Sequence, residues 1–281
     1  MAELTAQALG EAYARVLRKR LLLCLLLGLA LLASLVTDIA TGATPFAFGE
    51  VLGALFRPES VDPDSLVIVR ELRLPFALMA VLVGVALALA GAEMQTILDN
   101  PLASPFTLGV SSAASLGAAL AIVLGFGIPG VPDSWLVSLN AFVFAFASVL
   151  LLQAVASFAG GVQTLLLFGI ALVFCYNALV ALLQYLASAD ALQQLVFWSL
   201  GSLTRSSWPA VQTLTIVVLL VLPFSLRAAW PMTALRLGEE RALTLGIDVG
   251  RLRFGALLRI SLLAATAVAF VGTIGFIGLV G

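Results

Sequence analysis

Long apolar runs separated by short polar segments dominate this chain. Each run holds roughly 20 mostly apolar residues, which is enough for one helical crossing of a lipid bilayer. Seven spans are expected, at about residues 21–37, 75–92, 105–126, 134–158, 163–187, 209–226 and 254–281. The pattern therefore predicts an all-α fold, a polytopic bundle of transmembrane helices.

The first run also has features of a secretory signal peptide. It begins with basic residues, continues with an apolar middle, and is followed by "TDIATGA", which is only a fair cleavage site. We interpret the run as a retained membrane helix, with a signal peptide as the alternative.

Composition supports a membrane protein and argues against several other classes. Hydrophobic residues make up 62% of the 281 residues and charged residues 10%, which exceeds what a soluble core needs. The net charge of −1 and the single lysine, Lys19, provide no basic surface for nucleic acid. Histidine is absent, and Cys24 and Cys175 lie inside apolar runs. We therefore expect no metal site, no cofactor and no enzymatic triad.

Positive charges predict the orientation, because cytoplasmic loops of membrane proteins are enriched in Lys and Arg. When the loops are assigned alternately, one side receives Arg15, Arg18, Lys19, Arg20, Arg227, Arg236, Arg241, Arg251, Arg253 and Arg259. The other side receives Arg57, Arg70, Arg73 and Arg205. The N-terminus is therefore expected in the cytoplasm.

The segment "DNPLASPFTLGV" predicts a sharp cytoplasmic turn between the second and third spans. Asn100 and Pro101 should end one helix, Ser104 should cap the next, and Pro105 suits its first turn. Small residues then recur every four positions, at Gly109, Ala113 and Gly117, which favours close packing of helices rather than a substrate site.

A charged island, "RLGEERALTLGIDVGRLR", interrupts the apolar pattern near the C-terminus. Glu239 and Glu240 follow Gly238, where acidic residues favour the start of a helix. Gly246 can end that helix, and Asp248 can cap another that leads into the last span. The island predicts short helices at the cytoplasmic face, with an ordinary solvated loop as the alternative.

Four motifs in this order and spacing resemble one family of transporters. They are "ELRLPFALMAVLVGVALALAGAEMQTILDNPLASPFTLGVSSAASLGAALA", "LQQLVFWSLGSLTRSSW", "LRLGEERALTLGIDVGRLR" and "GTIGFIGLVG". Together they cover residues 65–281 and are similar to the permease subunits of bacterial ABC importers for iron-siderophores, haem and vitamin B12, the type II importers. The resemblance implies translocation of such a substrate across the inner membrane.

The resemblance also implies partners. They are two ATP-binding cassette ATPase subunits in the cytoplasm, a periplasmic or lipid-anchored substrate-binding protein, and a second permease copy in a homodimer that encloses the pathway. The charged island, within residues 231–253, is similar to the coupling helices that dock on the ATPase. The residues implied in ATPase coupling are Gly238, Glu239, Glu240, Ala242, Leu245 and Gly246. The chain has no G-x-x-x-x-G-K-[ST] phosphate-binding loop, so we do not expect it to be the ATPase, and the energy must come from another subunit or from an ion gradient.

Further residues match family positions at the two membrane faces. Arg73 matches an outer-face arginine that, in the vitamin B12 system, pairs with a glutamate of the binding protein. The family often has a second arginine where this chain has Phe76, and Arg70 can compensate. The alternative for Arg73 is a lone anchor at the membrane edge. Asn100 and Leu102 match a cytoplasmic constriction, here called the gate.

Three features of the spans depart from the family or are open to two interpretations. The second part of the family's gate is replaced by "GGVQ", residues 160–163. Glu93 stands where the family has an apolar residue, and we expect it to be solvated at the cytoplasmic edge. Asn177 and Gln184 share a helix face, which suits either the lining of the pathway or interhelical hydrogen bonds.

The resemblance implies about ten helices, of which this sequence would provide the first seven. We expect one transmembrane permease domain over residues 1–281, with the family's C-terminal helices absent from it, either because the sequence is a fragment or because the gene product is truncated. An ion-coupled secondary transporter or an inactive membrane fragment is the alternative. A secondary transporter would need ion-binding groups near the midplane, and apart from Glu93 none is expected deep in a span.

Overall fold

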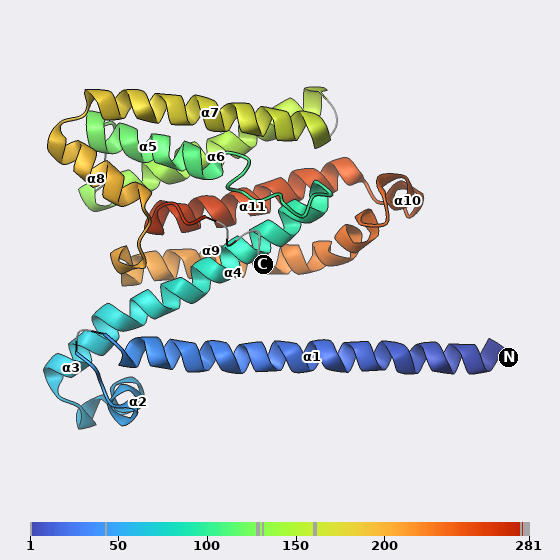
Figure 1. Cartoon of the computed structure of the whole chain (residues 1–281), viewed down its shortest axis with the longest axis horizontal. Coiled ribbons are helices and arrows are strands. Elements are labelled where there is room, and N and C mark those ends of the chain that lie inside the picture. The colour runs from blue at the N-terminus through green and yellow to red at the C-terminus, as the bar shows by residue number, and fades with distance from the viewer. Residues whose placement is uncertain are drawn as a thin grey trace. The chain divides into compact units, whose positions relative to one another are not determined.

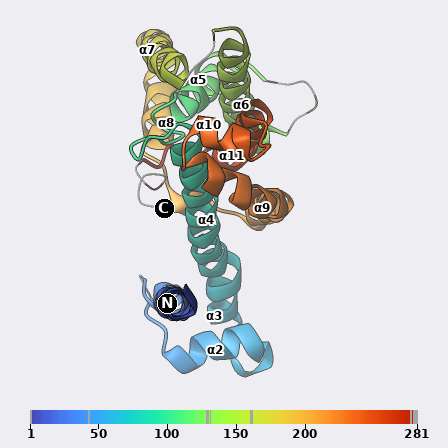
Figure 2. The ribbon, with the colours of Figure 1, turned by 90° about the vertical axis from the view of Figure 1, so that its right-hand side faces the viewer.

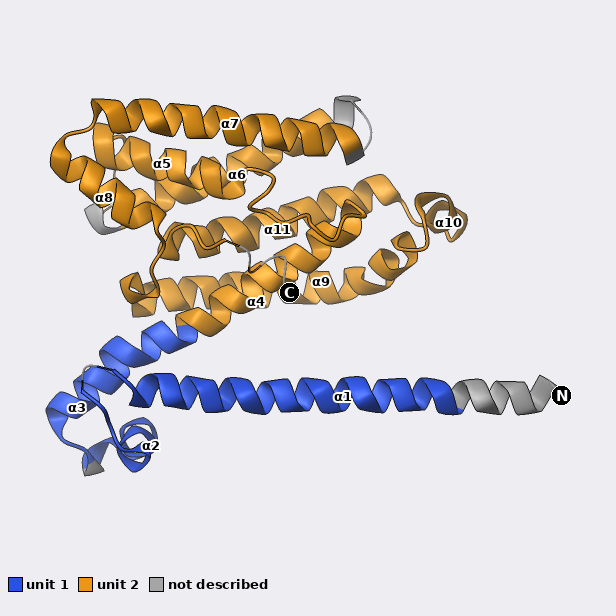
Figure 3. Ribbon diagram, in the orientation of Figure 1, with its two compact units in different colours: residues 1–78 blue, residues 79–281 orange. Residues whose placement is uncertain are grey.

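The computed structural model describes residues 2–42, 44–127, 130, 132–159, 162–275 and 277 (Figure 1). Within these ranges every regular element is a helix, which confirms the predicted all-α class. The chain divides into two compact units, residues 1–78 and 79–281, shown in different colours in Figure 3.

Unit 1 holds one long helix followed by several short ones. In chain order they are α1 (Ala2–Ala40), α2 (Phe48–Phe56), the 3-10 helix η1 (Pro58–Ser60), α3 (Pro63–Val67), the π-helix η2 (Ile68–Arg73) and the start of α4 (Leu74–Ile97). The core joins the end of α1 to α2 and η2 through Ile39, Val51, Ala54 and Val69. The first predicted span, residues 21–37, lies within the continuous helix α1.

The connection between the first two spans contains helices that the apolar pattern did not reveal. The segment that forms α2 is only 9 residues long, too short to register as a span. Its start is fixed by Glu50, whose carboxylate accepts a hydrogen bond from the backbone N–H of Ala47 at 2.9 Å. Such local capping stabilises a short helix that then buries Val51 and Ala54.

Unit 2 is a bundle of long helices with two short helices at its ends. After α4 come α5 (Val110–Leu124), α6 (Asp133–Ala159), α7 (Val162–Leu186), α8 (Ala189–Ser199), η3 (Leu203–Arg205), α9 (Trp208–Leu235), α10 (Glu239–Thr244) and α11 (Val249–Val271). α5 packs against α6, α7, α8 and α11, and α11 also packs against α6 and α9. Figure 1 places α8 and α10 at opposite ends of this bundle.

Six helices in the described residues are long and apolar enough to span a membrane. They cover Glu11–Ala40, Pro63–Ile97, Trp135–Val155, Gln163–Leu186, Trp208–Leu235 and Val249–Val271. α5 is apolar but has only 15 residues, which corresponds to about 22 Å at the helical rise of ~1.5 Å per residue. α5 is therefore a short helix surrounded by other helices of its unit.

The expected start of the third span, near Ser104, is wrong. α5 begins after Gly109, whose backbone is left-handed at φ 87°, so the helix cannot extend back through this residue. Ser104 instead belongs to a turn, in which its hydroxyl accepts a hydrogen bond from the backbone N–H of Thr107 at 3.3 Å. The last helix also differs from the expected 254–281, because α11 begins at Val249 and ends before Gly272, at φ 80°.

Gly117 shows why small residues recur in α5. A Cβ atom at this position would overlap the backbone carbonyl of Asn140 in α6 and would lie 3.0 Å from the Cβ of Phe144. Only glycine permits this approach of the two helix backbones. The packing interpretation of the small residues is confirmed at this crossing.

Candidate functional site: the coupling segment and the gate loop

The charged island folds into a helix with a defined start and end. Gly238, at φ 108°, precedes α10. Gly246, at φ 79°, follows it, and its N–H donates to the carbonyl of Leu243 at 2.9 Å while that of Ile247 donates to Ala242 at 3.1 Å. These bonds form a Schellman motif, a common helix ending that requires the left-handed conformation. The predicted roles of Gly238 and Gly246 as helix boundaries are confirmed.

Asp248 begins the next helix, as the sequence predicts. Its carboxylate accepts a hydrogen bond from the backbone N–H of Arg251 at 2.9 Å and caps α11. α10 is therefore connected to α11 by only a few residues, and Figure 2 looks onto this end of unit 2, with α10 close to α11.

Ala242 does not lie on an exposed face of α10. It is fully buried in a cluster with Ala234, Leu235, Ile247 and Val249. The resemblance implies a coupling role for Ala242, but its side chain cannot contact a partner directly, because its side of the helix packs against α9 and the start of α11. The exposed apolar side chains here are Leu237, Leu243 and Leu245, at 58%, 56% and 53% exposure.

The two glutamates of α10 have different surroundings. Glu240 is exposed, whereas Glu239 forms an ion pair with Arg253 of α11. The two guanidinium nitrogens Nη1 and Nη2 donate to the carboxylate at 3.4 and 2.8 Å. Arg253 also donates from Nε to the carbonyl of Ile97 at 3.4 Å. Sequence reasoning placed Arg253 on the cytoplasmic side but assigned it no contact.

The gate loop, residues 98–103, connects the end of α4 to the turn before α5. Asp99 adopts φ 46°, and the side-chain oxygen of Asn100 accepts a hydrogen bond from the backbone N–H of Leu102 at 2.9 Å. This Asx turn holds the Leu102 side chain at 72% exposure. The local turn thus holds an apolar side chain in an accessible position, as the predicted gate requires.

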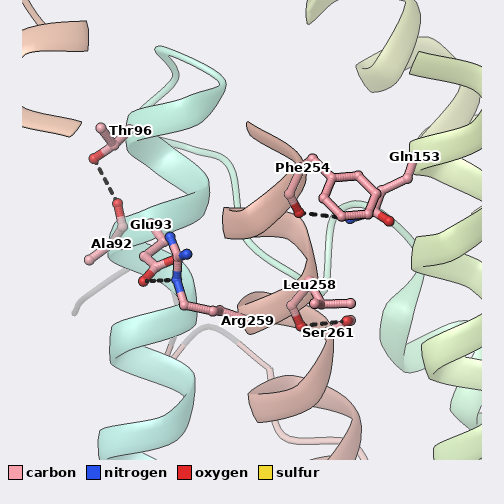
Figure 4. Close-up of polar contacts among 8 residues, drawn as sticks. All are labelled: Ala92, Glu93, Thr96, Gln153, Phe254, Leu258, Arg259 and Ser261. Carbon is pink, nitrogen blue, oxygen red and sulfur yellow. Dashed lines mark hydrogen bonds and ion pairs between the residues drawn. The ribbon is translucent and has the colours of Figure 1, made fainter. Parts of the chain in front are cut away.

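Glu93 is buried and paired, so the expectation of a solvated Glu93 is wrong. Its side chain is 4% exposed, and Arg259 of α11, 12% exposed, reaches across to it (Figure 4). Nε of Arg259 donates to both carboxylate oxygens at 3.0 and 2.9 Å. Nη2 lies 2.9 Å from Oε2, within ion-pair distance but not aligned for a hydrogen bond. The carboxylate is neutralised by a charge on a neighbouring helix rather than by water.

A further polar contact fixes the same part of α11 on its other side. The amide of Gln153 in α6 donates to the backbone carbonyl of Phe254 at 2.9 Å, as Figure 4 shows. The first half of α11 is thus hydrogen-bonded to α4 through Arg259 and to α6 through Gln153.

Arg70 and Arg73 hold the ends of helices within unit 1. Nε and Nη2 of Arg70 donate to the carbonyls of Ala54 and Leu55 in the last turn of α2, at 2.7 and 3.1 Å. Nη1 of Arg73 donates to Ile39 at the end of α1 at 2.8 Å. Both residues occupy the π-helix η2, and helix-end carbonyls lack partners within their own helix. Their predicted contact with a binding protein stays a prediction.

The polar residues proposed for the pathway lie on α7. Asn177 is exposed and Gln184 is half-buried within unit 2, so their common face is partly open. The neighbouring apolar side chains Phe174 and Tyr185 are 72% and 86% exposed. Of the altered gate turn, Gly160 and Gly161 lie outside the described residues.

A cavity of about 600 Å³ lies near α8, at the end of unit 2 opposite α10. The sequence pattern does not predict it. Its lining includes Trp135, Gln194, Trp198 and Arg205. Arg205 donates to the backbone carbonyls of Phe197 and Trp198, and burial lowers the pKa of its guanidinium. These bonds hold η3 against the end of α8.

Comparisons with known proteins agree with the arrangement of these elements. A model of the FecCD transport family matches residues 5–281. An ABC transporter permease protein of Methanocaldococcus jannaschii is 32% identical over 279 residues, covering 96% of this chain and 79% of that protein. A vitamin B12 import system permease protein of Vibrio parahaemolyticus is 38% identical over 234 residues, covering 83% and 69%. The solved structure of an inward-facing metal-chelate type ABC transporter aligns with a TM-score of 0.78 and 30% identity, covering 90% of this chain and 77% of that one.

Proposed function

The chain belongs to the FecCD transport family, and we propose that it is the translocation subunit of an ATP-driven importer for a metal chelate, haem or cobalamin. The substrate class is supported by a relative named for vitamin B12 import and by a structural neighbour of the metal-chelate type. Six apolar helices among the described residues are consistent with a multi-pass membrane permease.

The observation that carries the proposal is the exposed apolar surface of the coupling segment, residues 231–253. Leu237, Leu243 and Leu245 are more than half exposed on a segment that has its own buried cluster around Ala242. These leucines lie outside the apolar spans, on a charged segment, where exposed apolar side chains are candidates for contact with another protein. Because the sequence has no phosphate-binding loop, the expected partner is a separate ATPase subunit.

The remaining parts of the proposed assembly follow from the same function. Two permease copies enclose the pathway, and each contacts one of two ATPase subunits through α10. The N-terminus and α10 lie in the cytoplasm, and an outer binding protein delivers the substrate near Arg70 and Arg73. Asn100 and Leu102 form the cytoplasmic gate, and Asn177 and Gln184 of α7 contribute to the lining of the pathway.

The internal pairing of Glu93 is unfavourable for the alternative, an ion-coupled transporter. A carboxylate that binds a transported cation must exchange it, whereas Glu93 is already neutralised by Arg259 within the same subunit. The structure thus supplies no free carboxylate for coupling at this position.

The test is recovery of the ATPase with tagged permease from membranes that coexpress both. Leu243→Arg and Leu245→Arg place a charge on the proposed docking surface and should reduce ATPase recovery. Leu200→Arg is the matched control, since Leu200 is 69% exposed at the end of α8, away from α10. Equal recovery from all three variants would exclude α10 as the docking site. Ala242→Arg is unsuitable, because a charge there would disrupt the buried cluster.

The substrate is tested in proteoliposomes with the binding protein and ATPase present. ATP hydrolysis is measured with cyanocobalamin, haemin or a ferric siderophore as the probe. Stimulation by one of these identifies the substrate class, and stimulation by none contradicts the proposed class.

A further inference from the structure

We propose that Arg253 is the positioning residue through which the coupling helix α10 acts on the gate loop. The inference rests on the proposed function, since it assumes that an ATPase moves α10. Arg253 lies on α11 and is the point at which three elements meet, because its side chain contacts Glu239 of α10 and the carbonyl of Ile97 at the end of α4.

The contact between Arg253 and α10 consists of two hydrogen bonds between one guanidinium and one carboxylate. Two guanidinium nitrogens face two carboxylate oxygens, with the shorter distance at 2.8 Å between Nη2 and Oε2. Paired hydrogen bonds of this kind fix the orientation of both side chains, unlike the single point charge of a lysine. A displacement of α10 therefore displaces the Arg253 guanidinium with it.

The contact with α4 is made where the gate loop begins. Ile97 is the last residue of α4, and its carbonyl accepts the Nε–H of Arg253 at 3.4 Å. Three residues further on, Asn100 holds Leu102 through its Asx turn. The guanidinium thus contacts the backbone one helical turn before the residues of the gate.

A second ion pair connects α11 to α4 close to the gate loop, so the two helices should move together there. Arg259 pairs with Glu93, which lies one turn before Ile97 on α4. The buried pair anchors α4 to α11, while Arg253, 22% exposed, sits between the anchored helices and the exposed α10. Glu93–Arg259 supplies a fixed connection and Glu239–Arg253 supplies the connection to the moving helix.

The ion pair between Glu239 and Arg253 should contribute little to the stability of the folded permease. Glu239 is 52% exposed, and ion pairs with an exposed partner contribute little to stability. Loss of the pair should therefore leave the permease folded while it removes the link. Arg251 is the matched control, because it is 91% exposed and pairs with Asp248 at the start of its own helix.

The test uses Leu102→Cys as a reporter in a background with Cys24→Ser and Cys175→Ser. The permease is coexpressed with its ATPase, and labelling of the introduced thiol by a polar maleimide in inside-out vesicles is timed with and without a non-hydrolysable ATP analogue. The nucleotide should change the labelling rate in the parent and in Arg251→Ala. Arg253→Ala should lose this change while retaining its ATPase.

A double-mutant cycle tests whether the effect passes through Glu239. Glu239→Ala, Arg253→Ala and the double variant should lose the nucleotide response to the same extent, because each removes one link. Should Arg253→Ala fail to reach the membrane, Glu239→Ala decides the matter, since its side chain is half exposed, and it must likewise retain its ATPase because Glu239 is also implied in ATPase coupling.

The outcomes separate this inference from the function on which it rests. An unchanged nucleotide response in Arg253→Ala, or in Glu239→Ala, overturns the role of the link and leaves the proposed function intact. Absence of the ATPase from the parent permease contradicts the proposed function and the inference with it.

Discussion

Glu93 of α4 and Arg259 of α11 form a buried ion pair between two apolar helices. Each charge would be costly in this environment without the other, because an apolar medium does not replace the hydration of an ion. Burial on both sides makes the pair a connection between helices rather than a binding site.

The pair predicts an asymmetry between single and double substitutions. Glu93→Ala should destabilise unit 2 by about 3–5 kcal/mol, because it leaves the Arg259 charge buried without its counter-ion. Replacing both residues by leucine should cost less than either single substitution. Thermal unfolding of the purified permease in detergent measures this, and a double variant less stable than both single variants would contradict the prediction.

Close packing of α5 against α6 predicts that two glycine-to-alanine substitutions differ in their effect on stability. Gly117→Ala should destabilise the protein by roughly 1–3 kcal/mol, since its Cβ would overlap the carbonyl of Asn140. Gly84→Ala is the control, because among the described residues no heavy atom outside the nearby backbone of its own helix lies within 4 Å of a Cβ built at Gly84. The same detergent unfolding assay compares them. Equal loss in both variants would show that loss of glycine itself, rather than the crossing, causes the effect.

The sequence predicts the helices well because their signal is long and local. Runs of apolar residues and the glycines at 238 and 246 are sufficient to place the long helices and the bounds of α10. The sequence predicts the start of α5 incorrectly, because Ser104 has the chemistry of a cap whereas the left-handed backbone at Gly109 determines where the helix begins. That conformation depends on the surrounding packing and has no local signature beyond the glycine.

The contacts between helices were harder to predict than the helices themselves. An acid in one span and a base in another, Glu93 and Arg259, are a sequence signal for an ion pair between the two helices. The burial of Ala242 depends on which side of α10 faces α9. A 6-residue helix has too few apolar positions for the sequence to show which side is buried. The contacts of Arg253 join positions 97, 239 and 253, which no local pattern relates.

The distribution of positive charge predicts a cytoplasmic N-terminus. Asp62 and Glu240 are both exposed, so a cysteine can be placed at each in the background without Cys24 and Cys175. In intact cells a membrane-impermeant maleimide should label Asp62→Cys and not Glu240→Cys, and inside-out vesicles should give the reverse. Labelling of Glu240→Cys from outside, with Asp62→Cys protected, would invert the topology.

The hydrogen bonds of Arg73 predict that its first role is structural. Its guanidinium donates to Ile39 and Thr44 and lies 4.7 Å from the ring centre of Phe46. Arg73→Ala should therefore increase hydrogen exchange over residues 39–46, because the end of α1 and the following segment lose their partner.

Arg70→Ala is the matched variant for this experiment. It should instead increase exchange near residues 53–57, where Arg70 binds the last carbonyls of α2. The affinity of the binding protein is measured in parallel. If Arg73→Ala weakens that affinity while exchange over residues 39–46 stays unchanged, Arg73 contacts the partner directly and the capping role is wrong. A loss of affinity together with faster exchange means that Arg73 acts by holding the outer segment in place.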